Sequence, residues 1–224
     1  MTEPAPRPPS PAGGFRDSPV APPVVDFFYG LGSRYSYLAS TQLDRLSAET
    51  GCRIRWRPLY SGDLFEARGA NPFAGKPVSP QYDWAYRRRD AERWAACYGV
   101  PYREPEDVRF DPRRLALAAT AAARLGAVEA FSRRVFEALF AHGTSPLDDD
   151  ACARLAVQAG LAEKAFRIAL EQPATAAALR ATIEDAARLG VFGVPTFVLN
   201  GELYFGNDRL VLLRHALLQT RASE

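Results

Sequence analysis

GVFGVPTF, residues 190–197, leads from a glycine-rich turn into a short apolar strand. That strand is predicted over 196–199, Asn200-Gly201 is a hairpin signal, and a second strand follows over 202–205. A proline just before a strand leaves the preceding amide and carbonyl without a partner in the sheet. If the Val194-Pro195 bond is cis, these groups form an edge that pairs with an extended, peptide-like ligand. If it is trans, Pro195 is an ordinary loop proline.

The N-terminal part of the chain predicts a βαβ unit. An aromatic and β-branched run over 24–29 ends at Gly30, helical spacing extends from Ser33 to about Thr50, and a second strand covers 52–59. Two strands joined by a helix in this way are expected to be parallel, with a right-handed crossover.

Between these two regions nearly all the signal is helical. Residues 60–79 are predicted to form a long loop with one short helix, and glycine stops and Asp or Pro starts separate the segments that follow. Helices are predicted over 81–98, 112–125, 127–141, 148–159, 161–170 and 173–189, and a last one over 208–220.

The element order is therefore β-α-β, a helical block, and α-β-β-α. This order predicts an α/β protein with a thioredoxin-like fold and an all-helical insertion between the βαβ and ββα halves. We expect 24–60 and 190–220 to form the thioredoxin-like domain, and 61–189 to form the loop and helical insertion. Residues 1–23, rich in proline, alanine and glycine, are predicted to be a disordered tail.

The composition narrows the classes of function. A chain of 224 residues with 47% hydrophobic content can bury a full core, and its net charge of +2 gives no reason to expect nucleic acid as a partner. Arginines alternate with acidic residues along the helices, so the run 87–89, beside Asp90 and Glu92, is predicted to be a solvated helix face.

Membrane, secretory and metal-binding signals are also missing from the sequence. No segment reaches the roughly 18 apolar residues of a membrane span, and the N-terminus lacks the pattern of a secretory signal. Three scattered cysteines, Cys52, Cys97 and Cys152, then indicate reduced, buried thiols and a cytoplasmic location. With two histidines, His142 and His215, and no carboxylate-histidine cluster, a transition-metal site is not expected.

The predicted first helix begins opposite the Val194-Pro195 turn in a thioredoxin-like fold. A disulfide oxidoreductase carries C-x-x-C at this helix start, because the helix dipole and free amides stabilise a thiolate, whereas this chain has Ser33-x-x-Ser36. Without either sulfur, dithiol–disulfide exchange is excluded. Ser33 is instead a candidate donor to an anion, including the thiolate of a bound thiol, or it is simply the N-cap of the helix.

Three motifs in this order resemble the 2-hydroxychromene-2-carboxylate isomerases, which belong with the kappa-class glutathione transferases in the DsbA-like branch of the thioredoxin superfamily. They are Asp26-Phe27-Phe28-Tyr29 through Ser33-x-x-Ser36-Tyr37-Leu38, Gly193-Val194-Pro195-Thr196-Phe197, and Phe205-Gly206-Asn207-Asp208-Arg209. The resemblance extends over about residues 24–220.

This resemblance implies a glutathione site. Ser33 would hydrogen-bond to the glutathione sulfur and favour the thiolate, and the backbone of Val194, before a cis Pro195, would pair with the cysteinyl part. Asn207 and Asp208 would hold the γ-glutamyl end, and they are otherwise an ordinary helix cap.

A further match and two departures concern the surroundings of that site. Asn71 matches a family asparagine near glutathione and the substrate, or it is turn chemistry before a proline. Arg34 stands where the family usually has proline, and Gly30-Leu31-Gly32 replaces an aspartate and an apolar pair. Arg34 either suits an anionic substrate or points into solvent.

The implied reaction is an isomerisation of a small aromatic acid. A glutathione thiolate would add to the substrate, and ring opening, bond rotation and elimination of glutathione would follow. Four aromatic residues are candidates to stack on that substrate or to pack in the core: Tyr82, Trp84, Tyr86 and Trp94. The alternatives are a kappa-class-like glutathione transferase or peroxidase and a non-catalytic thioredoxin-fold binding protein. The apolar content of the helical block permits a homodimer.

Overall fold

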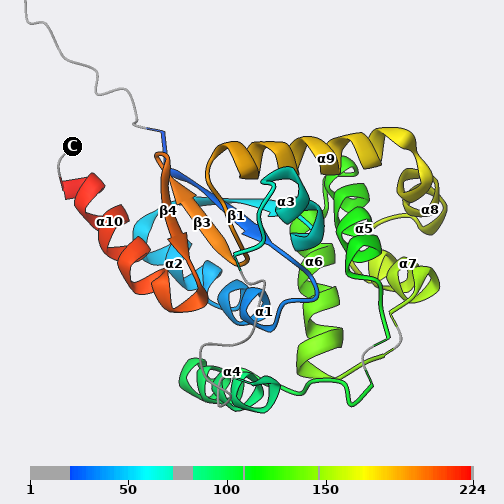
Figure 1. The fold of residues 1–224 in the computed structure, drawn as a ribbon, viewed down its shortest axis with the longest axis horizontal. Helices are drawn as coiled ribbons and strands as arrows, with labels where there is room; N and C mark the ends of the chain where they lie inside the picture. The colour runs from blue at the N-terminus through cyan, green and yellow to red at the C-terminus, as the bar shows by residue number, and fades with distance from the viewer. Residues whose placement is uncertain (1–20, 73–82, 108, 146, 223–224) are drawn as a thin grey trace, which may run out of the picture.

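The computed structural model describes residues 21–72, 83–107, 109–145 and 147–222. The elements follow one another as shown in Figure 1: β1 (Val24–Tyr29), α1 (Arg34–Ser40), α2 (Leu43–Thr50), β2 (Arg53–Pro58), α3 (Ser61–Ala67), α4 (Trp84–Tyr98), α5 (Pro112–Arg124), α6 (Val128–Phe136), the π-helix η1 (Glu137–Ala141), α7 (Asp149–Gln158), α8 (Glu163–Glu171), α9 (Pro173–Arg188), β3 (Thr196–Leu199), β4 (Glu202–Phe205), the 3-10 helix η2 (Asn207–Arg209) and α10 (Leu210–Ala222).

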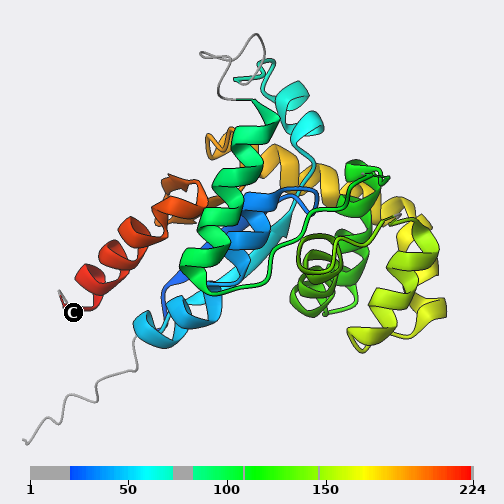
Figure 2. The same ribbon diagram turned by 90° about the horizontal axis from the view of Figure 1, so that it is seen from below.

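A four-stranded sheet in the order β2-β1-β3-β4 forms the centre of the thioredoxin-like fold. β1 and β2 are parallel, with Phe27 opposite Trp56, and β3 is antiparallel to both β1 and β4. The predicted βαβ unit and the 196–205 hairpin are thereby confirmed. The chain leaves the sheet after β2 and returns at β3, and of the helices between, α5 to α8 extend to one side of it (Figures 1 and 2).

Side chains of β1 point alternately to the two faces of the sheet, and each face has its own hydrophobic core. Val25, Phe27 and Tyr29 are fully buried in the larger core, which also takes side chains from α1, α2, α5 and α6. Phe28 faces the other way, into a smaller core under α3 and α9. Successive side chains of a strand point to opposite faces, so the run VVDFFY can be apolar on both.

One buried hydrogen bond ties the sheet to the helical block. The hydroxyl groups of Tyr29 on β1 and Ser132 on α6 lie 2.6 Å apart, and both side chains are fully buried. Burial is the main cause that raises the pKa of the Tyr29 hydroxyl well above its ordinary value, so this group stays a neutral partner. Tyr29 is the last residue of β1, and the loop to Ser33 begins directly after it. The bond to Ser132 therefore also helps to hold the start of that loop in place.

The first predicted helix, from Ser33 to about Thr50, is divided in two. The hydroxyl of Ser40 donates to the carbonyl of Tyr37, and that of Thr41 donates to Leu38, each at 2.7 Å. Side-chain hydroxyls that bond to backbone carbonyls compete with the regular helical pattern. The helix therefore ends at Ser40, and α2 begins at Leu43.

The cysteines agree only in part with the expectation of buried thiols. Cys52 and Cys152 are buried, whereas Cys97 on α4 is exposed, so the prediction was wrong for that residue. Among the described residues, no helix is both long enough and apolar enough to cross a membrane.

Candidate ligand site between the first helix and the Val194-Pro195 loop

The Val194-Pro195 peptide bond is cis. The loop that contains it is held by the buried hydroxyl of Thr196, which donates to the carbonyl of Gly193 at 2.8 Å. β3 pairs with its neighbours only from Thr196 onward, so Val194 lies outside the sheet ladder. The prediction of a cis proline next to a strand start is confirmed.

The third motif is attached directly to this loop. The amide of Gly206 donates to the carbonyl of Pro195 at 2.9 Å, which brings the start of η2 beside the cis proline. Gly206 has φ of +109°, and a Cβ atom there would lie 2.4 Å from Oδ1 of Asp208. The carboxylate of Asp208 therefore folds back over the one residue type that leaves room for it.

Ser33 lies on the other side of the same loop. Its amide donates to the carbonyl of Gly30 at 3.0 Å, and a Cβ atom on Gly30 would lie 3.4 Å from Cγ2 of Val194. The turn before α1 and the Val194-Pro195 loop are thus in van der Waals contact. The structure brings the motifs around Ser33, Val194 and Gly206 together, as the order of the motifs predicted.

Ser33 is the N-cap of α1. Its side-chain oxygen accepts from the amide of Ser36 at 3.2 Å, so the capping interpretation is correct. Capping uses Oγ as an acceptor and leaves the hydroxyl proton available for donation. The Ser33 residue is half-buried.

Asn207 and Asp208 are placed very differently. Asn207 is 4% exposed, its side-chain amide donates to the Tyr98 hydroxyl at 3.4 Å, and that hydroxyl donates to the carbonyl of Asn207 at 3.2 Å. Burial is the main cause that raises the pKa of Tyr98, which keeps its hydroxyl protonated as a donor. Asp208, in contrast, has a 43% exposed carboxylate 3.5 Å from Arg209. Of the two residues, Asp208 is the accessible one.

Asn71 is exposed and follows α3. Three residues before it, Arg68 donates from Nη1 to the carbonyl of Val191 at 3.0 Å. The segment that carries Asn71 is thereby joined to the loop that leads to Val194. A role for Asn71 at the site stays a prediction.

Arg34 does not point into solvent, so that expectation was wrong. Its side chain is 6% exposed, and Nε lies 3.0 Å from Oε1 of Glu104, which is 7% exposed. The indole of Trp84 stacks on the guanidinium, with 4.1 Å between Cζ and the ring centroid. Sequence analysis did not predict Glu104 as a partner, because the pairing depends on how the connection after α4 folds back onto α1.

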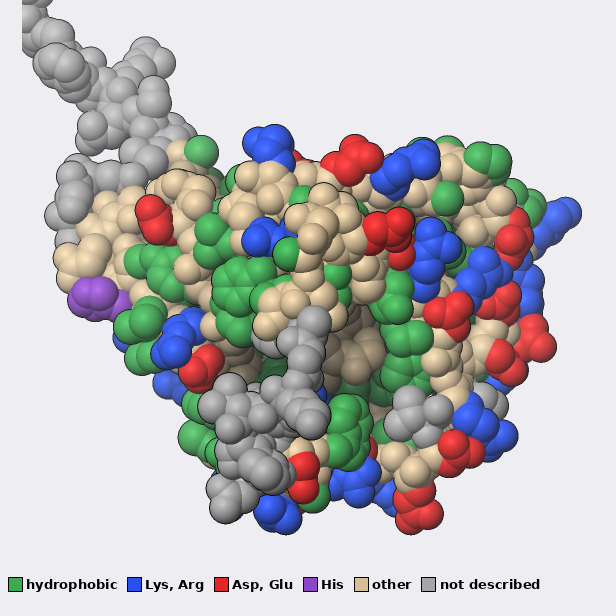
Figure 3. All heavy atoms as spheres, viewed as in Figure 1, with side chains coloured by type: hydrophobic (Ala, Val, Ile, Leu, Met, Phe, Trp, Pro, Cys, Tyr) green, Lys and Arg blue, Asp and Glu red, His purple; other side chains and the backbone are tan. Residues whose placement is uncertain are grey.

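Aromatic side chains contact the two neighbours of Ser33 in the chain, Gly32 and Arg34. A Cβ atom on Gly32 would lie 2.9 Å from Cε2 of Phe110, a contact that the sequence did not indicate. Trp84 is 58% exposed, whereas the ring of Trp94 packs on Tyr98 at 5.2 Å. Figure 3 shows the surface hollowed beside the loop between β1 and α1. Of the four aromatic candidates, Tyr82 lies outside the described residues.

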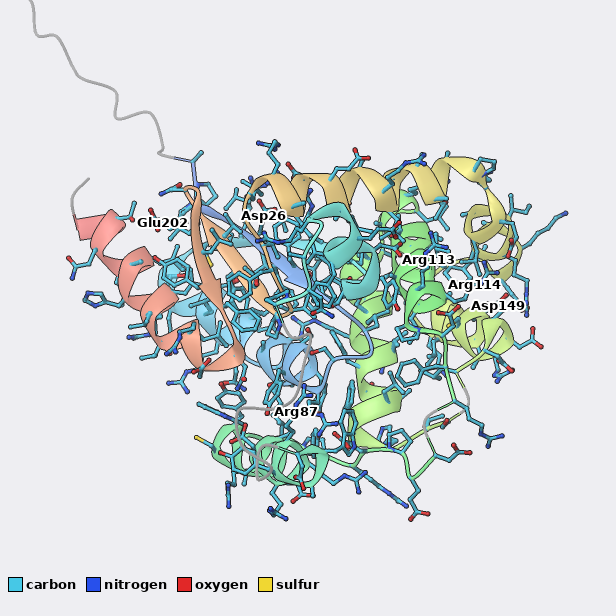
Figure 4. The ribbon with its side chains drawn as sticks, in the orientation of Figure 1. Asp26, Arg87, Arg113, Arg114, Asp149 and Glu202 are labelled. Atoms are coloured by element: carbon cyan, nitrogen blue, oxygen red, sulfur yellow. The ribbon has the colours of Figure 1, made fainter. Side chains whose placement is uncertain are left out.

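A separate cavity of about 680 Å³ lies between α5 and α7. Arg114 there bonds to Asp149 at 2.6 Å and also to Glu171 (Figure 4). The hydrogen bond from Arg114 is the main cause that lowers the pKa of Asp149. Three arginines and four aspartates line this cavity, and Arg114 is already paired with two carboxylates. Among the described residues, no group of His, Cys, Asp and Glu is arranged to hold a metal.

Comparisons with known proteins place this geometry in a family. The DSBA-like thioredoxin domain matches residues 24–218. A 2-hydroxychromene-2-carboxylate isomerase from Sphingobium xenophagum is 31% identical over 195 residues, covering 87% of this chain and 98% of that protein. Glutathione S-transferase kappa 1 from Rattus norvegicus is 25% identical over 217 residues, covering 88% of this chain and 92% of that protein.

A solved structure gives the same result for the fold. The structure of a 2-hydroxychromene-2-carboxylate isomerase superposes with a TM-score of 0.78 at 27% identity, covering 89% of this chain and 97% of that one. The motifs, the fold and these similarities agree. The chain belongs to the DSBA-like thioredoxin domain family and, within it, to the enzyme family of the 2-hydroxychromene-2-carboxylate isomerases.

Proposed function

We propose that this enzyme isomerises 2-hydroxychromene-2-carboxylate, or a closely related aromatic acid, with glutathione as cofactor. The observation that carries the proposal is the position of Ser33. It caps α1 where a disulfide oxidoreductase has its reactive cysteine, and it lies beside the Val194 loop with a hydroxyl proton left to donate. A site of this kind suits a thiol brought by the ligand.

The residues present fit glutathione along its length. Ser33 would donate to the sulfur, and the backbone of Val194, outside the sheet ladder, would pair with the cysteinyl amide and carbonyl. The exposed carboxylate of Asp208 would pair with the ammonium of the γ-glutamyl end. Asn207, held against Tyr98, would fix the backbone of η2 beneath it, and Asn71 would lie at the outer edge.

When bound, glutathione supplies a thiolate nucleophile that the side chains of this site do not provide. Ser33 favours the ionised thiol through a charge-assisted hydrogen bond. Backbone contacts at Val194 would fix the direction of the sulfur, and the ring of Phe110, which lies beside Gly32, would border it. A cytoplasmic location, where glutathione is abundant and thiols stay reduced, would suit this chemistry.

Substitution of Ser33 tests the proposal. Ser33→Ala removes the hydroxyl and the cap, whereas Ser33→Gly removes the hydroxyl and costs only a few tenths of a kcal/mol as a cap. We expect both variants to lose roughly 10- to 100-fold in kcat/KM for the isomerisation, since a hydrogen bond to a charged group contributes about 1.5–3 kcal/mol. Ser33→Thr, which keeps a hydroxyl, should lose less. If both hydroxyl-free variants matched the wild type, Ser33 would have no part in the chemistry.

Glutathione conjugation is a second candidate, favoured by the similarity to the kappa-class transferase. The two functions need the same thiolate and differ in the acceptor. Parallel assays with 2-hydroxychromene-2-carboxylate and with an electrophilic aromatic halide separate them. Turnover of the halide alone would favour the transferase, and turnover of the chromene carboxylate favours the isomerase.

A further inference from the structure

Arg34 is a buried cation directly beside the proposed nucleophile site. It follows Ser33 in the chain. Only 6% of its side chain is exposed, so it is more than nine-tenths buried between α1 and α4. Burying a guanidinium costs free energy unless its N–H groups are hydrogen-bonded. Arg34 is satisfied only in part, because Nε meets Glu104 while Nη1 is shielded from solvent and has no hydrogen-bond partner among the described residues.

A second guanidinium group, that of Arg87 on α4, also lacks a hydrogen-bond partner for one of its donors among the described residues. That donor is Nε, and it is buried. The guanidinium of Arg87 lies 5.6 Å from the centre of the Trp84 ring, on which Arg34 stacks at 4.1 Å. Figure 4 shows Arg87 on the α4 side that faces α1. The expectation of a solvated face over 87–89 was therefore wrong for Arg87.

Arg34 shares its carboxylate partner with another arginine. Glu104 accepts from Arg34 at 3.0 Å and from Arg88 at 3.2 Å, and it also accepts from the Tyr102 hydroxyl. One carboxylate thus serves two guanidinium groups, and Arg87 adds a third positive charge nearby.

Two carboxylates on or beside α4 accept hydrogen bonds from other groups. Asp83 caps α4 by accepting from the amide of Tyr86 at 2.7 Å, and Asp90 accepts from the hydroxyl of Tyr35 at 2.8 Å. The cluster of Arg34, Trp84 and Arg87, called here the α4 arginine cluster, has two buried N–H donors without an acceptor among the described residues.

We propose that the α4 arginine cluster binds the carboxylate of the substrate and selects aromatic acids over their neutral counterparts. The substrate carboxylate accepts from Nη1 of Arg34 and Nε of Arg87, and its flat ring stacks on Trp84. Trp84 is 58% exposed and is the first residue of α4, so a change of its side-chain torsions gives the carboxylate access to Nη1. A charge-assisted hydrogen bond compensates for the weaker cation–π contact that is lost.

This inference rests on the proposed function, and it concerns a residue that departs from the family pattern. The usual proline at position 34 offers no donor, whereas arginine offers five. The reactive sulfur would lie at Ser33, one residue away. An anchored carboxylate would then hold the unsaturated carbon next to it within reach of the thiolate.

Two stable ligands of the same shape test the proposal: chromone-2-carboxylate and the neutral chromone-2-carboxamide. Their dissociation constants are measured by calorimetry for the glutathione-saturated protein and for the protein alone. The wild type is expected to bind the carboxylate about tenfold or more tightly than the carboxamide, as for a hydrogen bond to a charged group. Arg34→Met and Arg87→Met should each reduce this ratio, and Arg34→Lys should keep part of it.

The matched control is Arg89→Met, which removes the same charge from an exposed position of α4. It should leave the ratio unchanged. Thermal unfolding and glutathione affinity of each variant report on folding, so a simple loss of structure is recognised. A ratio near one in the wild type, or an unchanged ratio in Arg34→Met, overturns the inference, even if the isomerase is active. A ratio that depends on Arg34 in a protein without isomerase activity supports the inference and rejects the proposed function.

Discussion

Replacing Gly206 by alanine should weaken glutathione binding through a residue that does not itself need to touch the ligand. The new Cβ would lie 2.4 Å from Oδ1 of Asp208, closer than any real contact of this kind, so the carboxylate has to move. Gly206 also has φ of +109° and ψ of 154°, a region almost restricted to glycine, where alanine costs roughly 1–3 kcal/mol. Loss of a partly exposed ion pair with the ligand ammonium should cost about 1 kcal/mol, or about fivefold in affinity.

Gly201, in the same hairpin, provides the matched control. It also has a positive φ, of +86°, but a Cβ atom there would meet nothing within 4 Å. Calorimetry with glutathione should therefore show reduced affinity for Gly206→Ala and unchanged affinity for Gly201→Ala, although both variants lose stability. In an Asp208→Ala background, Gly206→Ala should have little further effect on affinity. Equal glutathione affinity of Gly206→Ala and the wild type would refute the position assigned to Asp208.

Three further predictions concern buried and paired groups. Tyr29→Phe leaves the Ser132 hydroxyl buried without its partner and should cost about 1–3 kcal/mol in urea unfolding, and adding Ser132→Ala should cost less than the sum of the single losses. Burial raises the pKa of Cys152 to about 12, so at pH 8 a thiol reagent should modify exposed Cys97 and spare Cys152, as peptide mass spectrometry will show. The pKa of Asp149 is lowered, so its pairing stabilises the fold above the unfolded-state pKa of about 4 and ceases to do so as pH falls through the folded-state value. The stability difference between wild type and Asp149→Asn, followed by thermal unfolding, should accordingly be largest near neutral pH and vanish in acid.

Much of the fold follows from local sequence signals. The bounds of β3 and β4 agree with the predicted strands, because Asn200-Gly201 fixes the hairpin and Pro195 fixes where pairing can begin. The start of α5 agrees as well, since Asp111 caps the helix and proline is its first residue. The interruption between α1 and α2 was missed because helical spacing alone does not reveal hydroxyl groups that bond back to the backbone.

The site was predictable only where its parts are short motifs. Ser33, Val194 and Gly206 belong to such motifs, and the structure brings the three together through contacts between neighbouring loops. The burial of Arg34 was not predictable, because it depends on Glu104 and Trp84, which are distant in sequence and reach it only through the packing of α4 on α1. Long-range packing of this kind leaves no periodic trace in a single sequence.

The central claim is that Ser33 stabilises the thiolate of bound glutathione. The most direct measurement is a pH titration of the ultraviolet absorbance of that thiolate in the complex, for the wild type, Ser33→Ala and Ser33→Gly. We expect the wild type to hold the thiol pKa below the value of roughly 8.5 of an ordinary cysteine thiol, and both variants to raise it toward that value. The same thiol pKa in all three proteins would contradict the claim.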